Sequence, residues 1–554
     1  GDDLIILRRS IWAYVGPLPL ALIAYGLIGV PLLAGSIAMH LGRRTWLRSR
    51  WQLWSVAVLI CVGMAALQWK RLYRIDTFGV KENAVVYFVK EYKPPFRPID
   101  GPKMMEQFKG ELGAALHRTQ LPPSFAIKGA TVARDFPLPA AANDAATRDL
   151  NVVVLQVEST SALHVNRDTA PNITTLAQRG LSFKHHATVV TQTRPATYAL
   201  NYSDILPDLG THPSLVYGRP MPQPALAEVL QQAGYRTGVF HTGFLDYLEI
   251  RYLFQDKGMD VSIGAREMME KGAPLAYSSG VREERCVEEI AGWIRQKKDQ
   301  KFFAYYITEF PHHPYLSMAA IKPFPEDTWF NRYKNSLHYT DQAIGKLIDF
   351  LKAEGLFEKT LIVVVGDHGE TVSSYPVGHG LRVSAEEIRT PFILANPALF
   401  PTPVESRMNT SHLDMAPTIA SLLGLPAPKA WLGRDLLADA VPAQLHFASI
   451  THIRRTCLID GELMCVLERA SGKTHLYELG EATLTPLAEK DPRNRFMDRY
   501  RREMDWYAGW SVWRHLARAQ TPVGDKVAQD QGIDAPARRT ISDVSAAPVL
   551  RPRG

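Results

Sequence analysis

The sequence contains few cysteines, and none of them lie in a pattern that binds metal. Four cysteines occur among 554 residues, and the absence of a Cys-x-x-Cys pair argues against a thiolate zinc site. Cys61 lies in an apolar run and Cys286 stands alone, whereas Cys457 and Cys465 are close enough in sequence to form a local disulfide across a hairpin. A nucleic-acid-binding motif is also missing. The formal charge of +7 is spread widely and suits anionic lipid better than nucleic acid, so we expect no nucleic-acid partner.

Long apolar runs are confined to the first 74 residues. Residues 11–41 and 53–69 are each long enough to span a bilayer, which requires about 17 to 25 residues. The first run is too long for the core of a signal peptide and is followed by a second span, so we expect a multi-pass anchor. Because the chain starts with Gly rather than Met, we also expect residues upstream of it. The loop at 42–50 holds four arginines and no acid, which places it in the cytoplasm and the rest of the chain outside.

The segments that flank the expected globular part are irregular in composition. Residues 75–149 begin with an amphipathic stretch at 77–92, typical of a helix on the membrane surface, and continue as a linker rich in proline and alanine. Residues 518–554 have little apolar periodicity, and we expect a disordered tail there.

Between residues 150 and 440 the sequence alternates between strand-like and helix-like segments. This alternation predicts an α/β domain with a largely parallel sheet and helices on both faces. The predicted strands are 152–157, 238–240, 302–307, 361–365 and 391–395, and the predicted helices are 173–179, 281–295 and 337–353. Residues 441–517 predict a small antiparallel sheet, with strands near 448–450, 456–461, 463–467 and 475–479, and a final helix at 493–517.

Metal-binding residue types follow two of the predicted strands. Glu158 comes directly after the strand at 152–157, and Asp367 and His368 follow the strand at 361–365 after one glycine. The carboxyl ends of parallel strands meet at the edge of the sheet where open α/β folds bind ligands. We therefore expect these three side chains to share one site, in which carboxylate oxygens and an imidazole nitrogen hold a divalent cation.

A nucleophile is expected at the same edge. The segment Thr191–Leu200 lies one helix after the first strand, where a βα unit returns to the sheet edge. A threonine oxygen bound to a divalent cation is favoured as the alkoxide, and a helix that begins beneath it adds a positive dipole end for a phosphate. Thr191 and Thr193 are two residues apart, and both can coordinate.

Together these residues carry a family resemblance. From Asn151 to about Leu437 the chain resembles the alkaline phosphatase and sulfatase superfamily, and within it the membrane-anchored branch that includes lipoteichoic acid synthase, phosphoglycerol transferases and phosphoethanolamine transferases. The motifs that carry the resemblance occur in the family's order, and they are Val154–Ser159, Thr191–Leu200, Phe240–Gly243, Glu309–Tyr315, Tyr339–Asp341, Gly366–Glu370, Gly378–Gly380 and Asp414–Ile419.

The resemblance implies roles for individual residues. It implies that Glu158, Thr193, Asp367 and His368 bind one divalent cation, with Mn²⁺, Mg²⁺ and Zn²⁺ all compatible with this donor set, and that Thr193 is the group that becomes phosphorylated. It further implies that His241 and Arg251 contact the headgroup. His313 and His379 would contact the phosphoryl oxygens or protonate the leaving group. His312 is the alternative to His313, because one of the two can orient the other.

The resemblance also implies an activity. Sulfatases carry Cys or Ser in a C/S-x-P-S-R pattern, and Thr193–Thr197 keeps only the proline, which disfavours a formylglycine sulfatase. We therefore expect a transferase of the bacterial inner membrane with its catalytic domain outside. It would move a phosphoglycerol or phosphoethanolamine headgroup from a phospholipid donor to a hydroxyl of an envelope or secreted glycan. A phosphodiesterase or sulfatase-like hydrolase and a non-catalytic membrane scaffold are the alternatives.

Overall fold

The computed structural model describes residues 126–139, 147, 149–206, 221, 223–276, 280–375, 377–451, 453, 455–469 and 471–505. The predicted membrane spans, the surface helix and the tail lie outside these residues. Within the described part of the chain, no helix combines the length and the apolar character that crossing a membrane requires.

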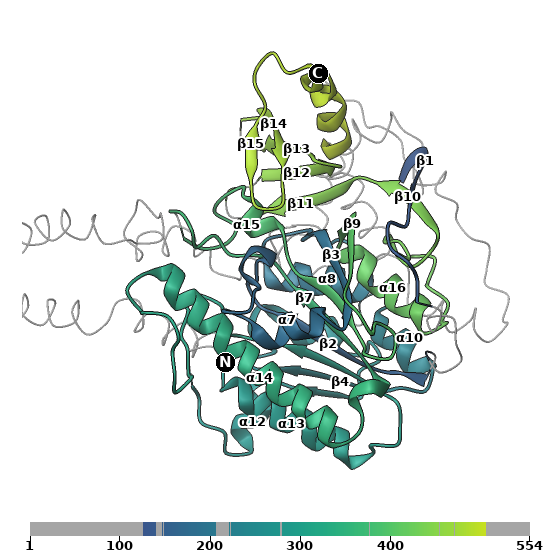
Figure 1. Cartoon of the computed structure of the whole chain (residues 1–554), viewed down its shortest axis with the longest axis vertical. Helices are drawn as coiled ribbons and strands as arrows, with labels where there is room; N and C mark the ends of the chain where they lie inside the picture. Colours follow the sequence, from purple (N-terminus) through teal and green to yellow (C-terminus); the bar gives the residue numbers. More distant parts are fainter. Residues whose placement is uncertain are drawn as a thin grey trace, which may run out of the picture.

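An eight-stranded sheet forms the centre of the molecule (Figure 1). Its strand order is β5-β4-β6-β2-β7-β8-β3-β9. The strands are β2 (Asn151–Val157), β3 (Gly180–Ala187), β4 (Arg236–His241), β5 (Val261–Ile263), β6 (Phe302–Ile307), β7 (Thr360–Gly366), β8 (Phe392–Ala395) and β9 (Val404–Ser411). All five strands predicted from the sequence are present, and β3, β5 and β9 were not predicted.

The sheet is mixed, because β8 runs antiparallel to both of its neighbours, β7 and β3, while the other pairings are parallel. The connection between β7 and β8 explains this exception. It contains only the short helix α15 (Ala385–Ile388), so the chain stays at the carboxyl edge of β7 and re-enters the sheet there, with Phe392 opposite Val365. A parallel strand would require a crossover to the far edge.

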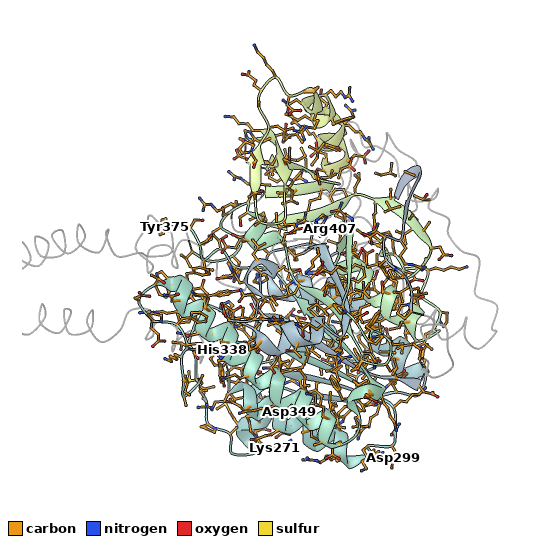
Figure 2. The ribbon with its side chains drawn as sticks, viewed as in Figure 1. Lys271, Asp299, His338, Asp349, Tyr375 and Arg407 are labelled. Carbon is orange, nitrogen blue, oxygen red and sulfur yellow. The ribbon has the colours of Figure 1, made fainter. Side chains whose placement is uncertain are left out.

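Helices cover both faces of the sheet, as predicted. One face is covered by α7 (Pro171–Ala177), α12 (Ala265–Glu270), α13 (Glu283–Gln296) and α14 (Trp329–Ala353). The other is covered by α8 (Thr193–Tyr202), α10 (Leu226–Gln232), α11 (Ile250–Phe254) and α16 (Met415–Leu422). Among the labelled side chains, His338 and Asp349 mark the path of α14 (Figure 2).

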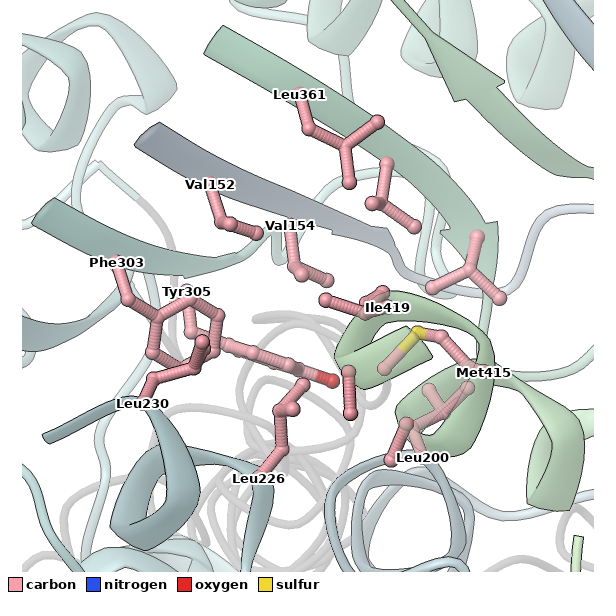
Figure 3. Close-up of a cluster of buried hydrophobic side chains, with 14 of the residues drawn as sticks. Val152, Val154, Leu200, Leu226, Leu230, Phe303, Tyr305, Leu361, Met415 and Ile419 are labelled. Atoms are coloured by element: carbon pink, nitrogen blue, oxygen red, sulfur yellow. The ribbon is translucent and has the colours of Figure 1, made fainter. Parts of the chain in front are cut away.

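The central strands bury both faces, which is why they appear in the sequence as continuous apolar runs. Val152 and Val154 of β2 pack with α8, α10 and α16, as the close-up of this cluster shows (Figure 3). Val153 and Leu155 of the same strand point the other way and pack with α7, α13 and α14. Both layers therefore hold β2 and fix the position of its carboxyl end.

A second sheet of five antiparallel strands follows the first, with β11 (His446–Ile450), β12 (Arg455–Asp460), β13 (Leu463–Glu468), β14 (Thr474–Leu479) and β15 (Leu484–Pro486) in sequence order. The predicted meander is confirmed. A further pair joins β1 (Ala126–Ala133), from the predicted linker, to β10 (Ala440–Gln444). Of the final helix predicted at 493–517, residues 493–496 belong to a 3-10 helix (Pro492–Phe496), residues 497–505 are α-helical, and residues 506–517 lie outside the described residues.

Cys457 and Cys465, which are close enough in sequence for a local disulfide, do not form one, and both are free and buried. The register places Cys457 opposite Val466 and Cys465 opposite Leu458. Successive side chains in a strand point to opposite faces, so the two sulfur atoms enter different apolar clusters on the two sides of the sheet.

Candidate active site

Glu158, Asp367 and His368 meet at the carboxyl edge of the central sheet. β2 and β7 pair in parallel with Val157 opposite Gly366, so the residues that follow the two strands emerge side by side. The ligand atoms of Glu158, Asp367 and His368 all lie within 4.8 Å of one another, and all three side chains are buried. His368 Nε2 is 3.7 Å from Glu158 Oε1 and 3.6 Å from Asp367 Oδ2.

Backbone groups orient these side chains toward the space between them. Asp367 Oδ1 accepts hydrogen bonds from the amides of Ser159 at 2.9 Å and His368 at 2.8 Å. His368 Nδ1 donates to the carbonyl of Gly369 at 3.0 Å, which leaves Nε2 with the lone pair. Asp367 Oδ2 and His368 Nε2 are buried without a hydrogen-bond partner. Such atoms are costly unless a ligand satisfies them.

Burial disfavours the charged forms of the two carboxyl groups in this cluster when no cation is bound. Burial, with the nearby Asp367 as the next contribution, raises the pKa of Glu158 well above its usual value, and burial also raises the pKa of Asp367. Burial lowers the pKa of His368, so its imidazole is neutral. Two buried carboxylates beside a neutral imidazole form a donor set that fits a divalent cation, as the sequence predicted.

Thr193 completes the set of four predicted ligands. It is the first residue of α8, and its hydroxyl lies 3.1 Å from Glu158 Oε2 and 3.3 Å from Oε1. The backbone N–H groups of the first turn of a helix favour an anion at this end. Thr191 lies elsewhere, because it is fully buried and its hydroxyl bonds to Ser449 of β11 at 3.4 Å. Of the two threonines that the sequence left open, Thr193 therefore faces the cluster.

His379 lies beside His368, with 4.2 Å between the ring centroids. Its Nδ1 is 2.6 Å from Glu370 Oε2, and the other oxygen of Glu370 accepts a hydrogen bond from the Tyr315 hydroxyl. Burial alone would lower the pKa of His379, but Glu370 outweighs burial and raises it. Glu370 and Tyr315 stood in motifs noted in the sequence but had no role assigned to them. Together they hold His379 in a state that can donate a proton.

The neighbouring pair His312 and His313 occupies different surroundings from those expected. The ring of His312 is 5.5 Å from that of His379. The ring of His313 packs instead against Trp329 and Tyr315, and burial lowers its pKa to about 2. The ring of His312 therefore lies beside His379, and the ring of His313 lies beside Trp329 and Tyr315, while the role of either histidine stays a prediction. The local reason is that His312 Nδ1 bonds the carbonyl of His313 at 2.8 Å, which turns the two rings apart.

His241 ends β4 at the same edge of the sheet. Its Nδ1 lies 3.1 Å from the carbonyl of Ile307, and its Nε2 lies 3.7 Å from Glu309 Oε2. Burial lowers its pKa to about 4. Glu309, which had no role in the prediction, is near enough to Glu158 to raise the pKa of that carboxyl. His241 and Glu309 therefore border the metal-type cluster.

Arg251 lies on α11 and forms ion pairs with two acidic residues outside this helix. Its guanidinium lies 2.7 Å from Asp246 and 2.6 Å from Glu267. A contact with a headgroup would require Arg251 to share its donors with these two acids, and its role in binding stays a prediction.

Comparisons with known proteins identify the family of the domain that carries these residues. A family model described as Sulfatase matches residues 150–425. Arylsulfatase A of Homo sapiens is 26% identical over 318 residues, which cover 48% of this chain and 62% of that protein. Lipoteichoic acid synthase-like YvgJ of Bacillus subtilis is 24% identical over 344 residues, which cover 57% of this chain and 54% of that protein. The match thus spans less than two thirds of either relative.

Among solved structures, a protein in the alkaline phosphatase superfamily from Vibrio parahaemolyticus aligns with a TM-score of 0.56 at 18% identity. The alignment covers 75% of this chain and 97% of that one. At this identity the likeness concerns the fold alone.

Proposed function

Residues 150–425 form a domain of the sulfatase and alkaline phosphatase-like superfamily, and from this premise we propose that the protein is a membrane-anchored transferase that moves a phospholipid headgroup through a phosphothreonine. The observation that carries the proposal is the position of Thr193. Its hydroxyl lies at the start of α8 and beside Glu158, within the set of side chains suited to a divalent cation.

In the first step, the Thr193 oxygen attacks the phosphorus of the lipid and the bond from phosphorus to the diacylglycerol oxygen breaks. The Thr193 hydroxyl already directs its proton at Glu158. Diacylglycerol leaves after its oxygen takes a proton, for which His379 is the source because Glu370 favours its charged form. A divalent cation held by Glu158, Thr193, Asp367 and His368 would neutralise phosphate charge and favour the threonine alkoxide.

In the second step, the hydroxyl of the acceptor attacks the phosphorus and the bond from phosphorus to the Thr193 oxygen breaks, and Thr193 takes back the proton that it directed at Glu158. His312 suits the role of the base, because burial, followed by the neighbouring His379, lowers its pKa and keeps it neutral. Its Nδ1 is committed to the carbonyl of His313, so Nε2 carries the lone pair that accepts the proton. Opposite pKa shifts in neighbouring groups are typical of an acid and base pair.

Several features support the lipid donor and the location. The spans predicted at 11–41 and 53–69 would hold the domain at the bilayer, and the arginines between them favour an external catalytic domain. The similarity to a lipoteichoic acid synthase-like protein is in keeping with a phospholipid donor and a hydroxyl acceptor on an envelope or secreted glycan. We place the protein in the bacterial inner membrane on these grounds.

The second candidate is a hydrolase on the same scaffold, and the similarity to arylsulfatase A favours it. In that case water would release the group from Thr193. The oxidation that forms formylglycine needs Cys or Ser, so Thr193 disfavours the sulfatase version.

The test is to incubate the full chain with vesicles of phosphatidylglycerol or phosphatidylethanolamine, Mn²⁺, Mg²⁺ or Zn²⁺, and a short glycan. Metal-dependent release of diacylglycerol, with the headgroup phosphate recovered on the glycan, is the expected result. Recovery of free headgroup phosphate regardless of the glycan would indicate the hydrolase. Absence of diacylglycerol release with every lipid and metal would contradict both.

A further inference from the structure

Gln156 is a polar residue inside the apolar run of β2. It lies two residues before Glu158, and its side chain is fully buried. Because side chains alternate along a strand, Gln156 points to the same side of the sheet as Val154, the side that α8 covers. Burying an amide is costly unless its polar atoms form hydrogen bonds. A glutamine at this position therefore needs specific partners on the α8 side of the sheet.

The hydrogen bonds of Gln156 connect the central sheet to the first turn of α8. Its amide nitrogen donates to the Thr197 hydroxyl at 2.8 Å. That hydroxyl donates in turn to the backbone carbonyl of Thr193 at 2.8 Å, which is nearer than the amide oxygen of Gln156 at 3.2 Å. The amide oxygen accepts from the hydroxyl of Tyr305 on β6 at 2.8 Å, on the same side of the sheet as Val154 (Figure 3). The bonds thus run in one direction, from β6 through β2 to the residue proposed as the nucleophile.

The helix α8, all of whose residues are described, begins without a side-chain cap. Gln192 is the N-cap residue, and its side chain makes no hydrogen bond to the backbone of the first turn. A Ser, Thr, Asp or Asn at this position would usually fix the first turn by such a bond. The hydroxyl of Thr193 is directed at Glu158 instead. Thr197 therefore holds the first turn from inside the helix, through the Thr193 carbonyl, and leaves the Thr193 hydroxyl to face the cluster.

Thr308 fixes the stretch of β2 that carries both Gln156 and Glu158. Thr308 is the residue after β6, and its amide donates to the carbonyl of Gln156 at 3.0 Å. Its hydroxyl accepts from the amide of Glu158, also at 3.0 Å. One short, doubly held segment therefore bears the side chain that anchors α8 and the carboxylate that faces the Thr193 hydroxyl. The distance between this carboxylate and the hydroxyl is set by these few bonds.

We propose that Gln156 and Thr197 are positioning residues, which hold the Thr193 oxygen in line with the phosphorus that it attacks. This inference rests on the proposed function. Both side chains act through the backbone carbonyl of Thr193. Phosphoryl transfer depends on an in-line approach of the attacking oxygen, and an error of about 1 Å in such a geometry can cost about 100-fold in rate. Loss of the hydrogen bond from Thr197 frees the uncapped first turn of α8, so the hydroxyl no longer keeps one orientation toward Glu158.

The test compares Thr197→Val with Thr418→Val, because valine has the shape of threonine without the hydroxyl. Thr418 on α16 is the matched control. It is equally buried, its hydroxyl donates to the carbonyl four residues earlier, that of Asp414 at 2.6 Å, and it accepts from the amide of Leu436 at 3.2 Å. Both variants should therefore lose a similar amount in Tm.

The activity readout is diacylglycerol release from vesicles of phosphatidylethanolamine or phosphatidylglycerol, with a divalent cation and a short glycan, at a temperature where all variants are folded. We expect Thr197→Val to lower kcat about 10- to 100-fold with little change in KM, because positioning acts on the transition state. Thr418→Val should keep the kcat of the wild type. Thr197→Ser, which restores the hydroxyl, should recover most of the lost kcat.

Gln156→Met should lower kcat in the same way, and combining it with Thr197→Val should slow the enzyme no further than the slower single variant, since the two residues act as one chain. The proposal is overturned if Thr197→Val and Thr418→Val have the same kcat, or if Thr197→Val changes KM alone. A wild type that releases diacylglycerol from neither lipid would instead refute the proposed function, so the two failures are distinguishable. If Thr197→Val does not fold, Gln156→Met decides the question by the same comparison.

Discussion

Asp367→Asn separates the cation-binding role of the cluster from its role in folding. The Asn side chain has nearly the same shape, and its oxygen can still accept from the amides of Ser159 and His368, which now bond to Oδ1. Its amide nitrogen would stand where the partnerless Oδ2 now stands. An amide N–H cannot bind a cation, but it can donate to Glu158. The substitution thus removes one ligand without opening a cavity.

The expected effect on metal stabilisation follows from binding linkage. A cation present at about 100 times its dissociation constant stabilises the folded state by about 2.7 kcal/mol. Unfolding entropy is about 2.1 cal/mol/K per residue, so a folded part of about 350 residues gains about 1.4 °C in Tm per kcal/mol. The wild type should therefore gain about 4 °C in Tm when the cation is added. Asp367→Asn should gain none.

Without metal the same variant should be more stable than the wild type. Removing one of two buried carboxylates relieves a desolvation cost of about 1 to 3 kcal/mol, which corresponds to about 1 to 4 °C. Differential scanning calorimetry with and without metal measures both effects. Asp349→Asn, on α14 with its side chain 78% exposed (Figure 2), is the control and should behave as the wild type. A cation-induced rise in Tm that survives in Asp367→Asn would refute the assignment of the site.

Three further outcomes are expected. Thr193→Ala should fold and lose turnover by several orders of magnitude, whereas Thr191→Ala should keep most turnover and lose only stability; near-normal rates in the first variant would contradict the choice of nucleophile. His312→Ala should slow the acceptor-dependent step and let phosphothreonine accumulate, while His313→Ala should mainly lower Tm; the reverse pattern would assign the base to His313. A cysteine at the exposed Ser373 should react with a membrane-impermeant thiol reagent once the outer membrane is opened, because the described native cysteines are buried, and protection in intact spheroplasts would refute an external domain.

Apolar runs made the centre of this fold predictable. The β2 and β7 strands are buried on both faces and therefore consist almost entirely of Val, Leu and Ile. Their carboxyl ends are adjacent because the strands pair in register, so the polar residues that follow them could be assigned to one site from the sequence.

Strands with polar sequences were missed. β9 (Val404–Ser411) is an edge strand, and its sequence is mostly polar because several of its side chains are exposed. β3 lies inside the sheet and is mostly buried, but the polar residues Lys184, His185 and His186 interrupt its apolar run. Periodicity identifies a strand only where burial imposes it.

Choices between neighbouring residues depended on contacts that a sequence does not contain. Thr191 is withdrawn from the site by its hydrogen bond to β11, a strand more than 250 positions away in the chain. His312 and His313 are adjacent in the sequence, but the loop turns the ring of His312 toward His379 and the ring of His313 toward Trp329. Glu309 could have been noticed as an acid three residues before His312, but its pairing with His241 requires the register of β4 and β6.

The central claim is that Thr193 carries the transferred group, and mass spectrometry tests it most directly. The full chain is incubated with vesicles of phosphatidylethanolamine or phosphatidylglycerol and a divalent cation, without an acceptor, and then digested. The peptide that contains both threonines should gain the mass of the headgroup phosphate, with fragmentation placing the group on Thr193 and the adduct absent from Thr193→Ala. Diacylglycerol release without any adduct on this peptide, or an adduct confined to Thr191, would contradict the claim.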